Sequence, residues 1–135
     1  RRAINALQAA SSLSRQVTAE TIYKAMGKAS PTTLREVIRE LLLGDFGKGS
    51  RALYRLVKDE GADPLDVIGF AHYDLLSTYS SYKLPEHVKP QLINLISSAH
   101  YRIIRGSDSI IQLLGLLSKM RAIISGINIV NQSQS

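Results

Sequence analysis

The clearest helical pattern in the chain lies between Ser30 and Gly44. Ser30 is a favoured helix-capping residue, and Pro31 suits the first helical position because its missing N–H would have no partner there. Apolar residues then recur at intervals of three and four, as they do on the buried face of an amphipathic helix. These residues are Leu34, Val37, Ile38, Leu41 and Leu42. The pattern predicts a helix that Gly44 stops.

Similar signals predict most of the remaining helices. Asp45 and Asp63 are capping residues, and each stands before an apolar pattern of helical period. The helix after Asp63 is apolar on most sides, so we expect it to be central. The predicted helices run from Asp45 to Gly61, from Pro64 to about Ser81, and from near Pro90 to Gly106, after two weaker patterns in RRAINALQAA and VTAETIYKAMG.

The last helix, opened by Ser107 or Asp108, has apolar residues on nearly every side. A helix that is apolar all round must be covered all round. Either it is wholly internal to the chain, or one face packs inward and another packs against a partner subunit. The candidate interface residues are Ile110, Ile111, Leu113, Leu114, Leu117, Met120 and Ile124, with Leu116 and Ile123 on neighbouring faces. Residues 127–135 lack a helical period, and we expect a flexible tail there.

Composition supports an all-α fold of one domain. The chain has 135 residues, of which 44% are apolar, 21% charged and only 6% aromatic, and runs of alternating β-branched residues are scarce. It has no cysteine, which excludes disulfides and thiolate metal sites. The longest apolar run, from Ile110 to Leu117, is interrupted by Gln112 and is too short to span a bilayer. We therefore expect a soluble helical bundle of about five helices.

The glycine-rich stretch GDFGKGS, from Gly44 to Ser50, invites comparison with a phosphate-binding loop. A Walker A loop has the form G-x-x-x-x-G-K-[ST] and directly follows a buried strand. Here Gly49 follows the Gly-Lys pair, and an amphipathic helix precedes the stretch. The sequence therefore favours a joint between two helices, with Gly44 in a left-handed turn.

No catalytic or metal-binding constellation is found. His72, His87 and His100 lie on three different segments, without the i, i+4 pairing of a zinc site. We interpret His72 and His100 as hydrogen-bonded packing residues. Asp74 and Ser77 lie near His72 in sequence, but helical spacing does not aim the three side chains as a hydrolytic triad requires.

The net charge of +6 suggests that the chain is attracted to polyanions. Most of the excess is diffuse, but four basic residues at i, i+3, i+7 and i+10 share one helix face, which could follow a phosphate backbone. They are Lys48, Arg51, Arg55 and Lys58. Asp59 and Glu60 dilute this basic stripe, and we find no interleaved aromatic residue for base stacking. We favour a solvated face or salt bridges between subunits over a DNA-facing site.

Taken together, the motifs resemble the small subunit of the replication factor C clamp loader in its archaeal form. The resemblance rests on RRAINALQAA, VTAETIYKAMGKASP, LREVIRELLLGDFGKGSRAL, DVIGFAH and YRIIRGSDSIIQLLGLLSKM, which occur in family order up to about Arg121. In that family an AAA+ ATPase module, which ends in a small helical lid, is followed by a helical collar. The chain starts within a helical pattern and without Met, so we read it as a piece of a longer protein.

The resemblance implies a domain plan and a set of partners. Residues 1–27 would be the end of the lid, 28–126 the collar that joins subunits into a ring, and 127–135 the tail. Arg1 would match the sensor-2 arginine that reaches ATP phosphates, although the family's preceding Gly-Asp is not in the chain. Walker A and Walker B are also missing, so we expect ATP and Mg to bind only in the parent protein, and no ATP hydrolysis by this chain.

The resemblance implies, as partners, other small and large clamp-loader subunits, including copies of the chain, together with the sliding clamp and primed DNA through the parent's ATPase domains. It implies a cytoplasmic location in an archaeon, or a nuclear one in a eukaryote. Two hypotheses remain: a non-catalytic oligomerisation domain, and a free-standing basic helical module that binds DNA. The first predicts self-association, and the second predicts salt-dependent binding of DNA.

Overall fold

A computed structural model of the chain describes residue 22, residues 29–78 and residues 80–134, with backbone only for 128–134. The described residues form five α-helices and one π-helical turn, without a strand, which confirms the predicted all-α fold. The elements are α3 (Pro31–Leu43), α4 (Phe46–Tyr54), the π-helical turn η1 (Arg55–Asp59), α5 (Pro64–Leu76), α6 (Lys89–Ile104) and α7 (Ser109–Gln134). Arg1, the two N-terminal helical patterns and the expected lid, residues 1–27, lie outside the described residues apart from Ile22.

Side-chain caps explain where the helices begin, largely as predicted. The Ser30 hydroxyl accepts the Thr33 amide at the start of α3. The carboxylates of Asp45 and Asp63 do the same for α4 and α5, by accepting the amides of Lys48 and Leu65. Asp108, rather than Ser107, caps α7 by accepting the Ile111 amide. Each cap satisfies an amide that has no partner within its helix.

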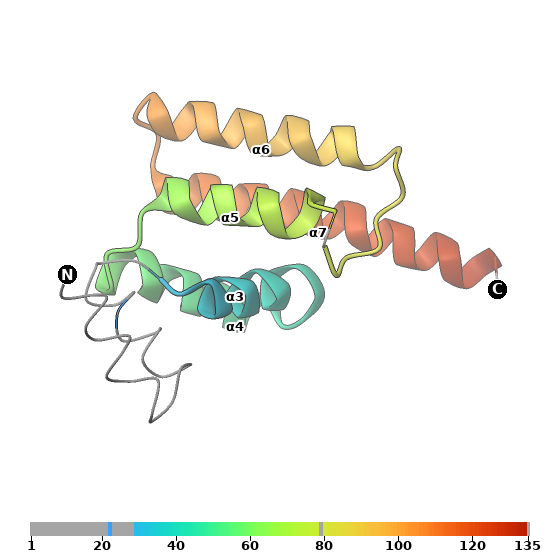
Figure 1. The fold of residues 1–135 in the computed structure, drawn as a ribbon, viewed down its shortest axis with the longest axis horizontal. Coiled ribbons are helices and arrows are strands. Elements are labelled where there is room, and N and C mark those ends of the chain that lie inside the picture. The colour runs from blue at the N-terminus through green and yellow to red at the C-terminus, as the bar shows by residue number, and fades with distance from the viewer. Residues whose placement is uncertain (1–21, 23–28, 79, 135) are drawn as a thin grey trace.

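The helices form a layered bundle around α7 (Figure 1). α6 lies along one side of the molecule, α5 and α7 lie in the middle, and α3 and α4 lie on the opposite side. α7 contacts α3, α5 and α6, and α4 is held mainly by α3. The core is one continuous apolar cluster to which every one of these helices contributes.

One predicted helix end and one predicted backbone conformation were wrong. α5 ends at Leu76 rather than near Ser81, because Ser77 takes an extended conformation and the hydroxyl of Ser80 accepts the Tyr82 amide. Hydroxyl side chains compete with helical hydrogen bonds in this way. Gly44 is not left-handed, since its φ is −111°. Its lack of a side chain instead leaves room for the Glu40 carboxylate, whose carbon would lie 2.8 Å from an added Cβ.

α4 crosses α3 at a glycine. An added Cβ on Gly49 would lie 2.8 Å from the Leu41 Cγ and 3.1 Å from the Leu41 amide nitrogen. The absence of a side chain therefore lets the two helices approach closely. The stretch GDFGKGS thus ends one helix, caps the next and supplies their crossing point, which confirms the predicted joint.

α7 differs from the sequence-based expectation at its C-terminal end. It continues to Gln134, so the segment expected to be a loose tail is helical through residue 134. No proline follows Gly126 to stop the helix, and Ile127 packs against the core. By length and composition alone, the stretch Ser109–Ile127 is long and apolar enough to cross a membrane. This corrects the estimate based on the run from Ile110 to Leu117, which by itself is too short to span a bilayer. The buried residues of this helix, Ile110, Leu113, Leu116, Leu117, Met120 and Ile124, lie in the core, where α7 contacts α3, α5 and α6.

Candidate assembly surface

Most of the predicted interface residues on α7 lie inside the chain. Ile110, Leu113, Leu117, Met120 and Ile124 are all buried in the monomer, and Met120 is completely inaccessible. Leu114 is half-buried, and Ile111 is 67% exposed. Of the seven candidate interface residues, these five therefore lie on the face of α7 that packs inward. Three neighbouring helices cover that face of α7.

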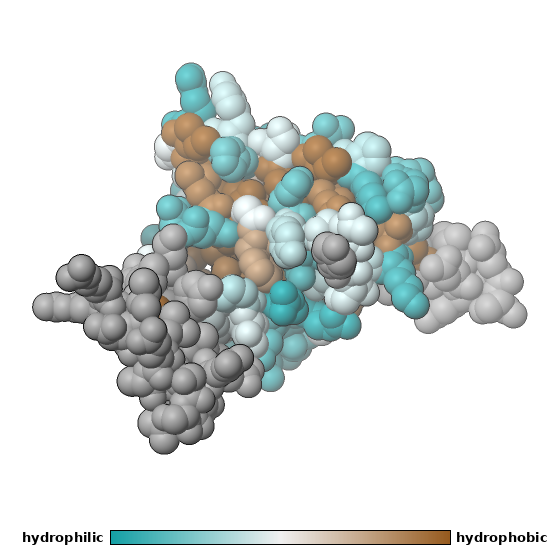
Figure 2. Space-filling view, viewed as in Figure 1, coloured by the Kyte–Doolittle hydropathy of each residue, from teal (hydrophilic) through white to brown (hydrophobic). Residues whose placement is uncertain are grey.

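The outer face of α6 carries the apolar surface that the chain leaves uncovered. Ile93, Tyr101 and Ile104 are exposed, with Ser97 between them, at the i, i+4, i+8 and i+11 spacing of one helix face. We call these four residues the α6 stripe. Hydrophobic surface is gathered over the side of the molecule where α6 lies (Figure 2). Leu92, Ile96 and Ala99 form the face of α6 that packs into the core, and the stripe lies beside that face.

A second surface, lined by both apolar and polar residues, lies between α6 and α7; Arg102, Gln112 and Lys119 line its hollow around Ile111. Small residues on the outer side of α7, Gly115 and Ala122 among them, leave two hollows along this boundary. One encloses about 310 Å³ and includes Ile111, and the other encloses about 390 Å³ and ends at Ile127. We call these hollows together the α6–α7 groove. Its α6 wall includes Leu95 and Ser98.

The two surfaces lie on opposite flanks of α6. At about 100° per residue, Ile93 and Leu95 point about 160° apart, and so do Ile104 and Arg102. Ile93 and Ile104 belong to the stripe, whereas Leu95 and Arg102 line the groove. The chain therefore presents a convex apolar row on one flank and a hollow on the other.

Arg121 fixes the joint between α3 and α4 from the opposite end of the sequence. Its guanidinium donates to the carbonyl oxygens of Leu41, at 2.8 Å, and Gly44, at 2.7 Å. It also lies over the Phe46 ring, 5.8 Å from the ring centroid. A cation at the C-terminal end of a helix satisfies free carbonyls and complements the helix dipole. No local pattern in the sequence indicates this role for Arg121.

Loss of the Arg121 hydrogen bonds should lower the stability of the fold measurably. Arg121→Ala is expected to lower the free energy of unfolding by about 2–3 kcal/mol, because it leaves two charge-assisted hydrogen bonds unmade. The free energy of unfolding of Arg121→Lys should lie between those of Arg121→Ala and the wild type, since a lysine lacks the planar fork that reaches two carbonyls. Urea denaturation followed by circular dichroism measures both. A loss below about 0.5 kcal/mol for Arg121→Ala would contradict this role.

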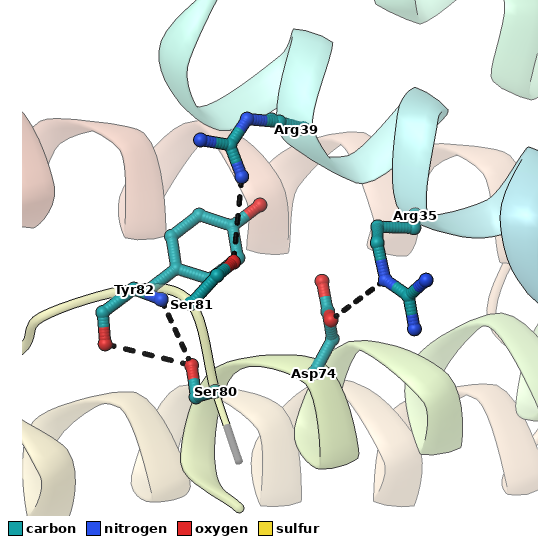
Figure 3. A network of polar contacts seen from close by, with 6 residues as sticks. All are labelled: Arg35, Arg39, Asp74, Ser80, Ser81 and Tyr82. Carbon is teal, nitrogen blue, oxygen red and sulfur yellow. Dashed lines mark hydrogen bonds and ion pairs between the residues drawn. The ribbon is translucent and has the colours of Figure 1, made fainter.

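A polar network around the buried residues Asp74 and Tyr82 joins α3, α5 and the segment that follows α5 (Figure 3). The Arg35 guanidinium donates to Asp74 Oδ1 at 3.3 Å, and Arg39 donates to the Ser81 hydroxyl and lies over the Tyr82 ring. Asp74 Oδ2 and the Tyr82 hydroxyl are buried without a hydrogen-bond partner among the described protein groups. Asp74 is therefore a structural carboxylate that is paired across the bundle. His72 is exposed, so the two do not approach a triad arrangement.

Tyr82 should make stability depend on alkaline pH. Burial, and secondly the negative charge of Asp74, raise the pKa of its phenol from 10.0 to about 12. The folded state favours the neutral phenol, so its contribution is complete below pH 10 and is lost as the pH rises from about 10 through 12. Tyr82→Phe removes the titrating group and its unpaired hydroxyl. We expect the variant to be at least as stable as the wild type at pH 8, and to lose less stability between pH 10 and 12, in parallel urea titrations. Equal losses would contradict the assignment.

The histidines do not pack as predicted. His72, His87 and His100 are all exposed, so the interpretation of His72 and His100 as hydrogen-bonded packing residues was wrong. His72 and His100 each follow a buried residue of a helix. One step along a helix turns the side chain by about 100°, which takes both histidines out of the core. Within the part of the chain that the structure describes, no group of three His, Asp, Glu or Cys side chains comes together in a metal-binding arrangement.

The four residues of the basic stripe are all exposed, on α4 and η1. The structure places an exposed aromatic residue among them, Tyr54, which corrects the statement that none interleaves. The π-helical turn also changes the expected spacing, because Lys58 follows Arg55 through a wider turn than an α-helix would make.

Comparison with known proteins adds a family match. Residues 29–119 match the family described as the Replication factor C C-terminal domain. The Replication factor C small subunit 2 of Pyrobaculum aerophilum is 39% identical over 127 residues, which are 94% of this chain and 39% of that protein. The Replication factor C small subunit of Thermofilum pendens is 41% identical over 120 residues, which are 89% of this chain and 37% of that protein. The chain thus spans less than half the length of these relatives.

Proposed function

Because the chain belongs to the family of the Replication factor C C-terminal domain, we propose that it is the oligomerisation collar of a clamp-loader small subunit. The observation that carries this proposal is the α6 stripe, an uncovered apolar row on one flank of α6, together with the α6–α7 groove on the other flank. Monomeric proteins rarely leave large aliphatic and aromatic side chains exposed in a row, and such rows mark surfaces that bind other proteins. Ile104 and Tyr101 are each about 60% exposed.

The arrangement of the two surfaces suits a ring. A symmetric dimer uses the same patch on both subunits, whereas a ring uses two different patches that fit each other head to tail. We assign the α6 stripe of one subunit to the α6–α7 groove of the next. The row of Ile93, Tyr101 and Ile104 is the convex partner, and Gly115 and Ala122 in the groove allow a neighbouring helix to approach closely.

The parent protein is proposed to use this ring in clamp loading. In the proposed domain plan, residues 1–27 end the AAA+ lid and residues 28–126 form the collar. ATP and Mg would bind in ATPase modules of the parent, with Arg1 as the sensor-2 residue, and this chain itself would not hydrolyse ATP. The collar would hold small and large subunits together while their modules load the sliding clamp onto primed DNA, in the cytoplasm of an archaeal cell or in a eukaryotic nucleus.

Sedimentation equilibrium over a concentration series tests this function. We expect the average mass of the 135-residue chain to rise above that of a monomer as concentration increases, because apolar surface is buried on association. A chain that stays monomeric at millimolar concentration, and that also fails to associate with neighbouring subunits, would contradict the proposal.

A further inference from the structure

The basic stripe lies on the side of the molecule away from α6, apart from both proposed assembly surfaces. α4 lies beyond α3, and α6 lies on the opposite side of the bundle (Figure 1). Lys48, Arg51, Arg55 and Lys58 are exposed, and among the described residues none of them forms an ion pair. Subunit assembly through α6 therefore leaves this surface accessible in our account.

Tyr54 gives the basic stripe a second property. It is 53% exposed and lies between Arg51 and Arg55 in sequence, while its neighbour Leu53 is buried. Three residues before it and four after it, Arg51 and Lys58 lie on the same side of the helix. In the π-helical turn more residues are needed for each turn, so Lys58 falls closer to the line of Tyr54 than an α-helix would place it. An exposed ring is thus flanked by cations.

Acidic groups limit where the positive charge is concentrated. Glu36 and Glu40 line the same hollow as Lys48, and Asp45 caps the helix start. Asp59 and Glu60 follow Lys58 at the other end. The stretch between them, from Arg51 to Lys58, contains three cations, one exposed aromatic ring and no acidic residue.

We propose that this stretch of α4 and η1 is a binding site for single-stranded nucleic acid. Arg51, Arg55 and Lys58 would contact successive phosphates, and the Tyr54 ring would stack on one base. A basic surface that follows the backbone, combined with aromatic rings that stack on bases, is the usual physical basis of sequence-independent single-strand binding. An acidic protein surface would use the cations but would not need the exposed ring.

The test is fluorescence anisotropy of a labelled 20-nucleotide single-stranded DNA titrated with the full chain. The variant Arg51→Glu/Arg55→Glu should bind at least about tenfold more weakly at low salt, and the slope of log K against log salt should shrink by about 1.4 for two lost phosphate contacts. Lys83→Glu/Arg105→Glu makes the same change in net charge at exposed positions elsewhere, and should lower affinity less than about twofold. Equal losses in the two variants, or no binding by the wild type, would overturn the proposal.

Tyr54 separates a nucleic-acid site from a general polyanion site. Tyr54→Ala should weaken binding of the DNA at least about fivefold, and Tyr54→Phe should retain it, because stacking needs the ring and not the hydroxyl. Inorganic polyphosphate, which has charge without bases, should bind both variants equally. If Tyr54→Ala leaves DNA affinity unchanged, the surface is a general polyanion or acidic-protein site and the proposal fails. Circular dichroism of each variant confirms that the fold is intact.

Discussion

Leu117→Glu is expected to unfold the chain. Leu117 is 1% exposed, and α7 presents it to the continuous apolar core. The substitution removes apolar contacts and buries a carboxylate, while the cation one turn along the helix, Arg121, is already bound to the Leu41 and Gly44 carbonyls. The cost is about 4 kcal/mol or more, a large share of the stability of a small domain.

Ile111→Glu is the matched control on the same helix. Ile111 is 67% exposed, so its carboxylate stays in water and the free energy of unfolding should change by less than about 0.5 kcal/mol. Thermal melting followed by circular dichroism compares the two variants. A folded Leu117→Glu chain with a melting temperature near that of the wild type would show that this face of α7 is not in the core of the monomer.

Ile104→Glu and Ile111→Glu are each expected to weaken self-association about 30-fold or more while leaving the chain folded. The α6 stripe contains Ile104, and the α6–α7 groove contains Ile111. A charge placed against an apolar row of the neighbouring subunit costs about 2 kcal/mol or more, which corresponds to that change in the dissociation constant. Arg102 and Lys119 also line the hollow around Ile111, so the effect should be larger for Ile104→Glu than for Ile111→Glu. Leu43→Glu is the control, since Leu43 is also exposed but lies at the end of α3. Sedimentation equilibrium of the four chains gives the comparison.

Mixing the two variants tests the head-to-tail arrangement separately. The Ile104→Glu chain keeps an intact groove, and the Ile111→Glu chain keeps an intact stripe. In a ring the intact surfaces of the two variants can meet once, so an equimolar mixture should form a heterodimer and nothing larger. In a symmetric dimer each interface would contain both changes, and mixing would not restore association. If mixing does not restore association, the result contradicts the assignment of two different surfaces but not assembly through α6.

The sequence was sufficient where structure depends on neighbouring residues. The starts of α3, α4 and α5 follow from Ser30 with Pro31, from Asp45, and from Asp63 with Pro64, because a cap acts on an amide two or three residues away. The joint at Gly44–Ser50 was predicted for the same reason. The family resemblance, supported by the order of several such motifs, agrees with the match over residues 29–119.

The assembly surface could not be chosen from the sequence, because it depends on which helices meet. α7 is apolar all round, and only its contacts with α3, α5 and α6 decide that Leu117 is covered and Ile111 is not. Ile93 and Ile104 appeared to be additional apolar residues beside a clear core stripe, although they form the exposed face of α6. Their signal in the sequence is an apolar pair that lies about 100° around the helix from the core residue Leu92.

Long-range polar contacts were missed for a similar reason. Arg121 is separated from Leu41 and Gly44 by 80 and 77 positions, and nothing in its own neighbourhood indicates that it caps α3. The same holds for Asp74, whose partner Arg35 lies 39 residues away. Such pairs follow from the packing of whole helices and become visible only when the bundle is assembled.

The most direct test of the central claim, that the outer face of α6 is covered by a neighbouring subunit, is hydroxyl-radical footprinting of two tyrosines at increasing chain concentration. Tyr101 and Tyr54 are 61% and 53% exposed, and they lie on α6 and α4 respectively. Assembly through α6 predicts that the oxidation rate of Tyr101 falls as oligomers form, while that of Tyr54 stays constant. Unchanged oxidation of Tyr101 at concentrations where sedimentation shows oligomers would contradict the account.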